Sequence, residues 1–444
     1  MRFHRQMILA QLLWLLCVAS CEASNPFGPG LTTLFKEAHS QKSDLARYQY
    51  LSHALLTSPP GEYSFALQLY AFTENELGLY NEALRDYPLR SAPIAGLTLP
   101  SPAAWQPADA ADAIAEAATG HRLVMINEAH HDAHTRQLTL LLLPKLRAAG
   151  FKYFAAEALG PDDALEKRGY PTSASGSEYL HEPLYGEIIR EAIRLGYTIV
   201  PYDSSQRDVQ KREEDQARNL FDSIFRKDAS ARVFVHAGYA HIDKKEGRLG
   251  NVRPMGMLLG NMIGEQPFSI DQTQFREQFP NIDQQYLQLI RTFRPKGPTV
   301  LVNKNGGRIW AAAPAQYDVS VILPSERKSA LDSGSLRSQV IIRDANQPFP
   351  MTAHIVNTQR PDWMDLGGQR RPYPIRTQLC KAVIPCVVEA RYQGENDQAI
   401  PADRYAFIHP NSAADLYLFP GQYRLSARGP QGKLLSDRTI SVDR

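Results

Sequence analysis

A stretch before the middle of the chain, VMINEAHHDAHTR, concentrates side chains that can carry protons. An apolar run over Leu123–Ile126 ends there, and one carboxylate and three imidazoles follow it at Glu128, His130, His131 and His134. Histidine titrates near neutral pH, and a neighbouring carboxylate can orient it. The stretch is typical of an acid–base site, although a polar surface loop rich in histidine explains these residues equally well when they are taken alone.

Two later segments, LRAAGFKYFAAE and IRLGYTIVPYD, repeat one design of helix, glycine, aromatic residue, apolar strand and acid. Glu157 follows Gly150 by seven positions, and Asp203 follows Gly196 by the same seven. Successive strand residues advance equally, so equal offsets place both carboxylates at the same edge of a sheet. The pattern therefore predicts that these two acids lie on the side where the histidine-rich stretch begins.

The segment RVFVH is typical of another strand, and its last residue is His236, with His241 in the loop that follows. Polar groups at the ends of several strands are typical of an α/β active site, because ligands bind at the carboxyl ends of parallel strands. We therefore expect Glu128, Glu157 and His241 to belong to one site. Four further residues are expected near the site, namely His130, His134, Asp203 and His236.

The elements that must position these residues alternate from residue 109 onwards. Predicted helices cover 109–119, 132–149, 184–195 and 208–225, and predicted strands cover 123–126, 151–157, 197–203 and 232–236. Short strands at 299–302 and 308–312 are expected at the edge of the same sheet. Helices and strands in alternation predict an α/β domain over 98–325, with a mainly parallel sheet and flanking helices.

The segments on either side of this domain have different patterns. Residues 25–97 are predicted to be helical, with small and aromatic residues spaced as in a tetratricopeptide unit at Ala71, Gly78, Tyr80, Ala83 and Tyr87. A single such unit cannot bury its own face, so it should pack on its neighbour. Residues 336–444 contain short β-forming runs between turn signals, which predict an all-β sandwich that serves as a spacer or docks a protein partner.

Residues 1–24 are typical of an export signal, with Arg2 and Arg5 before an apolar core. Val18-Ala19-Ser20-Cys21 resembles a bacterial lipobox, which would attach a lipid to Cys21, whereas cleavage after Ala23 would release a soluble protein. Either outcome predicts an exported protein, in the periplasm or anchored to the outer membrane by its lipid. In an oxidising compartment Cys380 and Cys386 are expected to form a disulfide, with two buried thiols as the alternative.

The overall charge of the chain excludes one class of partner. The formal net charge of +2 over 444 residues predicts no nucleic-acid partner.

Residues 159–183 are rich in Gly, Ser and Pro, and follow Glu157 closely in the chain. A long connection of this kind is usually functional or disordered, so we expect a lid or a substrate-selecting loop, with disorder as the alternative.

The ordered motifs between Val124 and Leu259 resemble a superfamily that contains erythromycin esterases, ChaN-like haem-binding lipoproteins and TIKI/TraB-type proteins. The motifs are NEAHH, FAAE, KREEDQARNL, VHAGYAHI and PMGMLL. The ChaN and TraB motif maps onto His130, whereas the esterase motif maps onto His131, and Asn127 stands where both have glycine. His241 is the matched histidine of the later motif.

The esterase resemblance implies an exported hydrolase that attacks an ester-like bond of a small molecule with an activated water and needs no cofactor. His131 would be the general base, Glu128 or Glu157 would orient it, and His241 or Arg212 would stabilise the oxyanion. No serine or cysteine nucleophile is evident near the motifs, which favours direct attack by water.

Two other functions remain open from the sequence. The first is a ChaN-like lipoprotein that binds haem or a divalent metal without catalysis, and the second is a TIKI-like metal-dependent peptidase. Neutral imidazoles with carboxylates suit a divalent metal that keeps one position open. In these alternatives the ligands would be His130, His131, Glu157 and His241.

Overall fold

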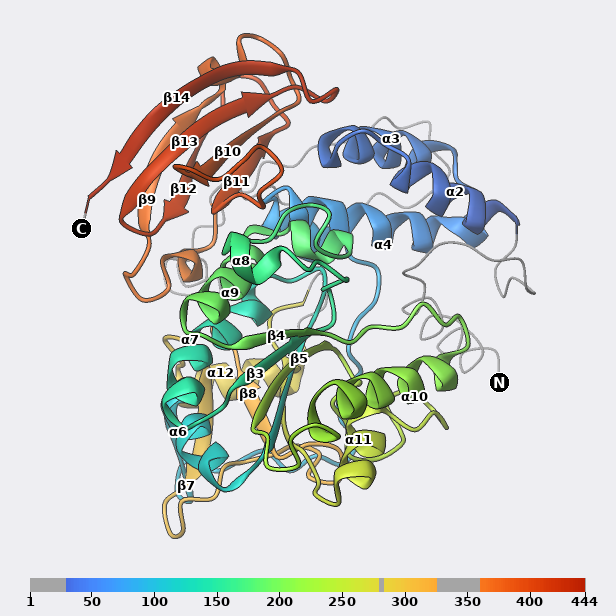
Figure 1. The fold of residues 1–444 in the computed structure, drawn as a ribbon, viewed down its shortest axis with the longest axis vertical. Helices are drawn as coiled ribbons and strands as arrows, with labels where there is room; N and C mark the ends of the chain where they lie inside the picture. Colours follow the sequence, from blue (N-terminus) through green and yellow to red (C-terminus); the bar gives the residue numbers. More distant parts are fainter. Residues whose placement is uncertain (1–28, 279–282, 326–359, 444) are drawn as a thin grey trace.

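The computed structural model describes residues 29–278, 283–325 and 360–443 (Figure 1). The expected export signal with Cys21, and the β-forming runs at 338–344 and 351–357, lie outside the described residues. Within the described ranges, no helix is both long enough and apolar enough to cross a membrane.

The centre of the fold is an eight-stranded sheet with the order β1-β7-β8-β6-β2-β5-β3-β4. Strands β8, β6, β2, β5, β3 and β4 are parallel, and β7 runs antiparallel to both of its neighbours. The strand bounds are β1 (Trp105–Asp109), β2 (Leu123–Glu128), β3 (Tyr153–Ala156), β4 (Thr198–Pro201), β5 (Val233–Gly238), β6 (Phe268–Phe275), β7 (Thr299–Asn303) and β8 (Val319–Ile322). The predicted α/β class with a mainly parallel sheet is confirmed.

Helices cover both faces of this sheet, with α6, α7 and α9 on one side and α10 and α11 on the other (Figure 1). Their bounds are α6 (Ala110–Ala117), α7 (His134–Ala148), α9 (Pro183–Arg194), α10 (Val209–Leu220), α11 (Met255–Ile263) and α12 (Gln284–Phe293). Strand β2 is buried along its whole length, as expected for a parallel strand with both faces covered. Val124 and Ile126 belong to one core, and Leu123 and Met125 to the other.

Glycines end two of these helices as the sequence predicts. Gly150 follows α7 with a φ of 91°, and Gly196 follows α9 with a φ of 74°. An L side chain is disfavoured in this left-handed region, so glycine allows the chain to leave the helix and enter the next strand.

The N-terminal region consists of the helices α2 (Pro29–His39), α3 (Asp44–Thr57), α4 (Pro60–Glu76) and α5 (Tyr80–Asp86). Helices α2, α3 and α4 share a small core of their own. Tyr80 joins the core of the α/β domain, whereas Leu77 and Leu79 join the core of the C-terminal sheets. The N-terminal helices therefore pack against both neighbouring parts of the chain.

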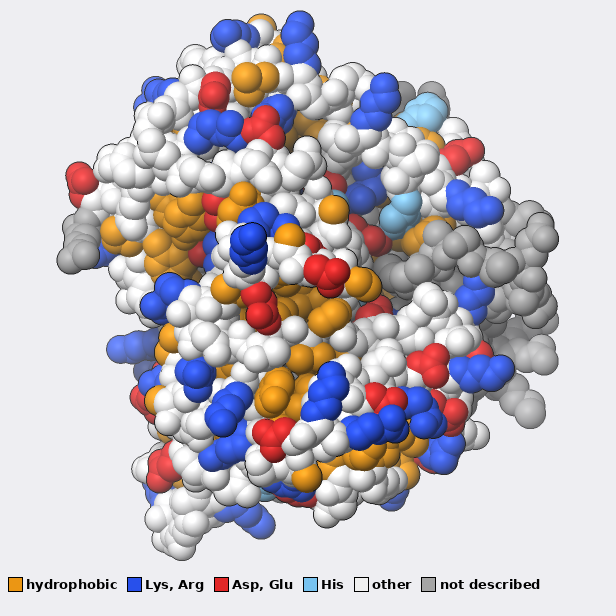
Figure 2. Space-filling model, viewed as in Figure 1, with side chains coloured by type: hydrophobic (Ala, Val, Ile, Leu, Met, Phe, Trp, Pro, Cys, Tyr) orange, Lys and Arg blue, Asp and Glu red, His pale blue; other side chains and the backbone are white. Residues whose placement is uncertain are grey.

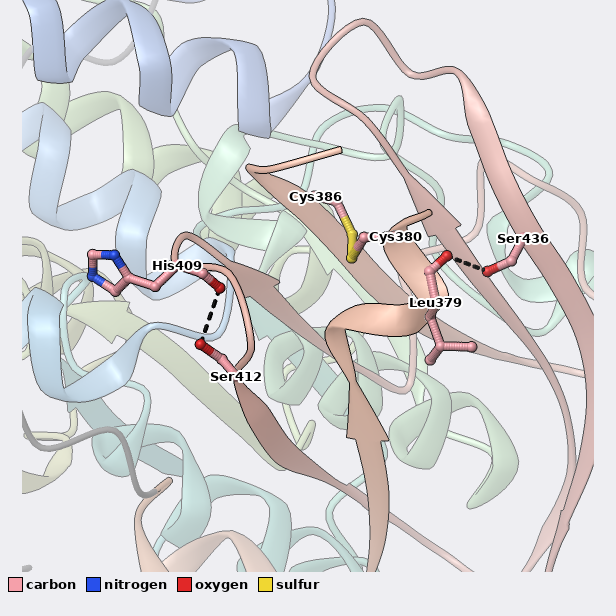
Figure 3. Close-up of a disulfide and its surroundings, with 6 residues drawn as sticks. All are labelled: Leu379, Cys380, Cys386, His409, Ser412 and Ser436. Atoms are coloured by element: carbon pink, nitrogen blue, oxygen red, sulfur yellow. Dashed lines mark hydrogen bonds between the residues drawn. A yellow bond between two sulfur atoms is a disulfide. The ribbon is translucent and has the colours of Figure 1, made fainter. Parts of the chain in front are cut away.

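The C-terminal part is a sandwich of a four-stranded and a two-stranded antiparallel sheet with one shared core. The larger sheet has the order β11-β10-β13-β14, and the smaller sheet pairs β12 with β9. The bounds are β9 (Arg371–Arg376), β10 (Cys386–Tyr392), β11 (Asp403–Phe407), β12 (Ala413–Leu418), β13 (Gly421–Arg428) and β14 (Leu434–Val442). The predicted disulfide is confirmed: Cys380 and Cys386 are bonded, with Cα atoms 5.9 Å apart (Figure 3).

One expectation about secondary structure is corrected. Residues 308–312 do not form a strand, and only a single bridge joins Ile309 to Val302. Residues 159–183 contain the short helix α8 (Leu165–Arg168) and a 3₁₀ turn, Glu178–His181. This segment is tied to the C-terminal part by backbone hydrogen bonds, one of them from Ser173 to Gln398.

Candidate functional site

The register of the parallel strands brings three of the predicted residues to one edge of the sheet. Glu128 ends β2 beside Gly238 of β5. Glu157 follows β3 directly, where Ala156 is paired with His236 of β5. Because β2, β5 and β3 are neighbours and parallel, their carboxyl ends meet on one side, where α/β proteins bind ligands.

Glu128 and His130 form a close pair immediately after β2. His130 Nδ1 lies 2.7 Å from Glu128 Oε1. The other carboxylate oxygen of Glu128 accepts from Arg136 Nε, and His236 Nε2 lies 3.3 Å from it. Burial alone would raise the pKa of Glu128, but the charge of Arg136 and the hydrogen bonds from both histidines hold the pKa well below its usual range. Glu128 is therefore an anion that orients His130.

Glu157 is the centre of a second cluster. Its Oε1 accepts from Arg212 at 2.9 Å and lies 3.4 Å from His241 Nε2, and its Oε2 accepts the backbone N–H of Gly238. Burial acts to raise the pKa of Glu157, yet the charges of His241 and Arg212 and the hydrogen bond from Gly238 lower it to about 2. This carboxylate is therefore charged throughout the neutral range.

His241 lies between two carboxylates. Its Nδ1 is 2.5 Å from Glu213 Oε1, and its Nε2 faces Glu157. Burial opposes the charged imidazole, but Glu213 first and Glu157 second raise the pKa of His241 to about 9. Glu213 is held in turn by the backbone N–H of Met255, at 2.6 Å from Oε2. His241 is therefore a cation at neutral pH.

The two clusters meet at Gly238. A Cβ atom added at this position would lie 2.7 Å from both Cε1 and Nε2 of His130, and 3.1 Å from Glu157 Oε2. Such distances are shorter than ordinary van der Waals contact, so only glycine allows the imidazole and the second carboxylate to approach from either side. His130 therefore has Glu128 at its Nδ1 and the Glu157 cluster near its Nε2.

His131, the residue expected to be the general base, faces a different environment. Its Nδ1 lies 3.0 Å from the Tyr239 hydroxyl, and Arg276 Nη2 lies 3.2 Å from its Nε2. The ring stacks on Tyr87 with the centroids 3.5 Å apart. Burial and the charges of Arg276 and Arg90 hold the pKa of His131 well below its usual range. The ring is thus neutral, and its lone pair points at a guanidinium.

The remaining predicted residues support the site or lie beside it. Asp203 accepts from Arg212 at 2.8 Å and thereby holds the guanidinium against Glu157. His236 is fully buried, with its Nδ1 2.9 Å from the Thr139 hydroxyl. His134 stacks on Trp363 with the centroids 5.0 Å apart, which places it in a packing contact with the chain that precedes the C-terminal sandwich.

The segment over 159–183 covers His130. Tyr179, from the 3₁₀ turn, stacks on the His130 ring at 4.0 Å between centroids and at an angle of 9°. His130 is 6% exposed, Glu157 7% and His241 7%, so the cluster is nearly closed to solvent. A role for this segment in admitting a substrate remains a prediction.

Sequence reasoning missed several charged residues that hold the site. Glu213 stands directly beside the predicted Arg212 on α10, yet nothing in the motif indicated its contact with His241. Arg136 lies eight positions after Glu128, on the first turns of α7, and also binds the buried Glu182 at 2.9 Å. Arg136 is followed by the apolar run of α7, and an arginine next to such a run could have indicated a buried ion pair.

The expected metal ligands do not converge on a point. Among the described residues, the set of His130, His131, Glu157 and His241 does not offer three ligand atoms within 4.8 Å of one another. Arg276 faces His131 Nε2, and Arg212 contacts Glu157 Oε1, so guanidinium groups already engage two of the expected ligand atoms. A protonated His241 has no lone pair for a metal. These residues therefore do not fit a resident metal in this arrangement.

Comparison with known proteins gives no family. No family model matches the chain, and no curated protein matches it. One solved structure, described as "Bacterial protein toxins", aligns with 59% of this chain and 70% of its own, at 11% identity and a TM-score of 0.27. A likeness at this level carries no argument about fold or activity.

Proposed function

We propose that the chain is an exported hydrolase in which His130 activates a water molecule for attack on an ester-like bond. The observation that carries this proposal is the Glu128–His130 pair, at 2.7 Å, with Glu157 and His241 near the opposite side of the imidazole. A carboxylate accepts only, so the proton between the two residues belongs to His130 Nδ1. In the neutral imidazole this tautomer leaves a lone pair on Nε2, which is the atom a general base needs.

In the proposed reaction, His130 Nε2 removes a proton from a water molecule as the water oxygen attacks the carbonyl carbon of the substrate. The negative charge then gathers on the former carbonyl oxygen. Arg212 and His241 supply positive charge next to Glu157, within 2.9 and 3.4 Å of its Oε1. Such preoriented charge in a site with little water stabilises the oxyanion. His130 then returns its proton to the departing alcohol, and the carbon–oxygen bond breaks.

The proposal moves the role of base from His131 to His130. His131 is neutral and its Nε2 faces the Arg276 donor, so its lone pair is engaged by a cation. His130 has the opposite arrangement, because an anion fixes one nitrogen and the other lies toward the charged cluster. Glu157 keeps the role of partner, but to Arg212 and His241.

The test compares three histidine variants in the exported protein. The variants are His130→Gln, His131→Gln and His53→Gln. His53 is exposed on α3, so His53→Gln serves as the control. Turnover is measured on p-nitrophenyl esters of graded acyl length and on a macrocyclic lactone. We expect His130→Gln to lower kcat by about 10²–10⁴-fold, the usual contribution of a general base. His131→Gln should lower kcat much less than His130→Gln does.

A melting curve for each variant separates loss of the base from loss of the fold. Turnover that survives in a folded His130→Gln, or a larger loss in His131→Gln than in His130→Gln, would contradict the proposal. An absorption scan for haem and a metal analysis of the wild-type protein test the non-catalytic alternative directly. Stoichiometric haem or metal without turnover would favour that alternative over hydrolysis.

A further inference from the structure

A cavity lies where three parts of the chain meet, and none of the residues of the Glu128 and Glu157 clusters lines it. It has a volume of about 510 Å³. Its walls come from the turn between α2 and α3, from Ser173 and His181, and from β10, β13 and the loop over 397–401 of the C-terminal sandwich. Figure 2 shows basic, acidic and histidine side chains close together in the region of the N-terminal helices. Cavities of this size commonly hold small organic ligands.

The side chains that line the cavity carry an excess of positive charge. Three are carboxylates, namely Asp44, Glu389 and Asp397. Five are permanently or normally cationic, namely Lys42, Arg47, Arg391, Arg404 and Arg428. The lining is thus positive by two charges before its two histidines are counted. A pocket with this balance attracts anions and disfavours free cations.

Most of these cations already have partners. Arg47 contacts Asp44 at 3.1 Å, Arg391 contacts Glu389 at 2.7 Å, and Arg428 contacts Asp397 at 3.1 Å. Asp44 also accepts from Arg404 at 2.7 Å, so every carboxylate of the lining already has a cationic partner. The surplus of positive charge therefore rests on the cations that remain.

The donors that remain are the Lys42 ammonium and one guanidinium nitrogen of Arg404. Lys42 is exposed at the turn before α3 and forms no ion pair or hydrogen bond within the described part of the chain. Arg404 is only 4% exposed, and its Nη1 contacts Asp44 at 2.7 Å. Its Nη2 is buried and lacks a hydrogen-bond partner among the described residues. A buried donor without a partner costs free energy, which a bound acceptor would recover.

A metal ion is the competing occupant. Asp44, Glu76 and His181 offer ligand atoms within 4.8 Å of one another beside this cavity. However, Arg47 contacts both carboxylates and Arg404 contacts Asp44. Two guanidinium groups already neutralise this cluster, so a dication would have to displace them.

We propose that this cavity binds a small organic anion, with its carboxylate or phosphate group between Lys42 and the arginines Arg404 and Arg428. Arginine suits both groups because its planar guanidinium can donate two parallel hydrogen bonds. The cavity is also lined by four apolar side chains, namely Leu45, Leu77, Val387 and Ile400. They provide contact for the carbon skeleton. An inorganic anion alone would leave these apolar side chains without a contact.

Calorimetric titration of the full-length exported protein tests this assignment. The probes are citrate, which carries carboxylates, glucose 6-phosphate, which carries phosphate, and glucose as the neutral control. We expect at least one of the two anions to bind, with an affinity that falls at high salt, and glucose not to bind. The probe that binds more tightly identifies the anionic group. Absence of binding by both anions, or equal binding by glucose, would overturn the proposal.

Two variants locate the binding. Lys42→Ala removes an exposed side chain without an ion pair, so the fold should be unaffected, and Arg428→Gln removes a half-buried donor. Each substitution should lower the affinity for the anion by about tenfold or more, which is the usual loss for one hydrogen bond to a charged group. Lys227→Ala, an exposed lysine after α10, is the matched control and should bind as the wild type does. Unchanged affinity in both Lys42→Ala and Arg428→Gln would show that the anion binds elsewhere.

Discussion

The charge of His241 is central to the proposed chemistry, and Glu213→Gln tests its origin. Glu213 lies 2.5 Å from His241 Nδ1 and is the largest of the causes that raise the pKa from 6.5 to about 9. That difference corresponds to about 3 kcal/mol in favour of the protonated imidazole. Glutamine removes the charge while keeping an oxygen that can accept the backbone N–H of Met255. In Glu213→Gln the pKa of His241 should fall, because burial and Arg212 still lower it and Glu157 is the main remaining group that raises it.

The same shift predicts how stability changes with pH. A group whose pKa is higher in the folded state contributes stability fully below its unfolded pKa and loses that contribution as the pH rises through the folded pKa. For His241 the window runs from pH 6.5 to about 9. The free energy of unfolding of the wild type, relative to Glu213→Gln, should therefore fall by up to about 3 kcal/mol across this window.

Two measurements check this prediction. Proton and nitrogen resonances of the imidazole report the pKa of His241 directly, and urea unfolding at a series of pH values reports the stability difference. Glu214→Gln is the matched control, since Glu214 is the next residue on α10 and pairs with Arg253 on the surface. An equal pKa of His241 in the two variants, or a stability difference that does not change with pH, would refute the reasoning.

Two further predictions concern stability. Replacing Cys380 and Cys386 by serine should lower the free energy of unfolding by about 2 kcal/mol, because the disulfide closes only a short loop. Urea unfolding of the oxidised protein and of the serine variant measures this difference. Equal stability would show that the bond does not constrain the unfolded chain. Arg136→Met should cost about 3–5 kcal/mol, because two buried carboxylates lose their cation. The exposed Arg226→Met should change stability little, and equal losses in the two arginine variants would contradict the buried-charge argument.

The parts of the fold that the sequence predicts well are those with local signals. Glu157 follows β3 directly and Asp203 follows β4 closely, as the equal offsets from Gly150 and Gly196 predict. Each strand is a short apolar run, and each glycine lies in the left-handed region at the end of a helix. These features depend on neighbours in the chain, so they can be recognised without knowing the tertiary structure.

Strand β6 could not be recognised in this way. Its residues are all buried, yet Asp271, Gln272 and Thr273 are polar and interrupt the apolar pattern. Their partners are distant in sequence: Asn127 donates to Asp271 at 2.7 Å and accepts from the backbone of Gln272 at 2.8 Å. A strand that is satisfied by long-range hydrogen bonds has no periodic signal of its own.

The choice between His130 and His131 also depends on distant residues. The two histidines are adjacent in one turn, closed by a bridge between Ala129 and Asp132. Tyr179 covers one ring, and Arg276 faces the other. Both partners lie outside the motif, and Arg276 is 145 positions from His131. The spacing of the motif therefore could not determine which ring faces the two glutamates.

The 3₁₀ turn over Glu178–His181 is a wall shared by both proposed sites. Tyr179 stacks on His130, while Glu178 binds His39 at 2.7 Å and His181 contacts Asp44 at 3.1 Å beside the proposed anion cavity. An anion that repositions this turn must alter substrate affinity at His130, and thermodynamic reciprocity requires the substrate to alter anion affinity by the same factor. Both effects would be carried by a turn of only four residues.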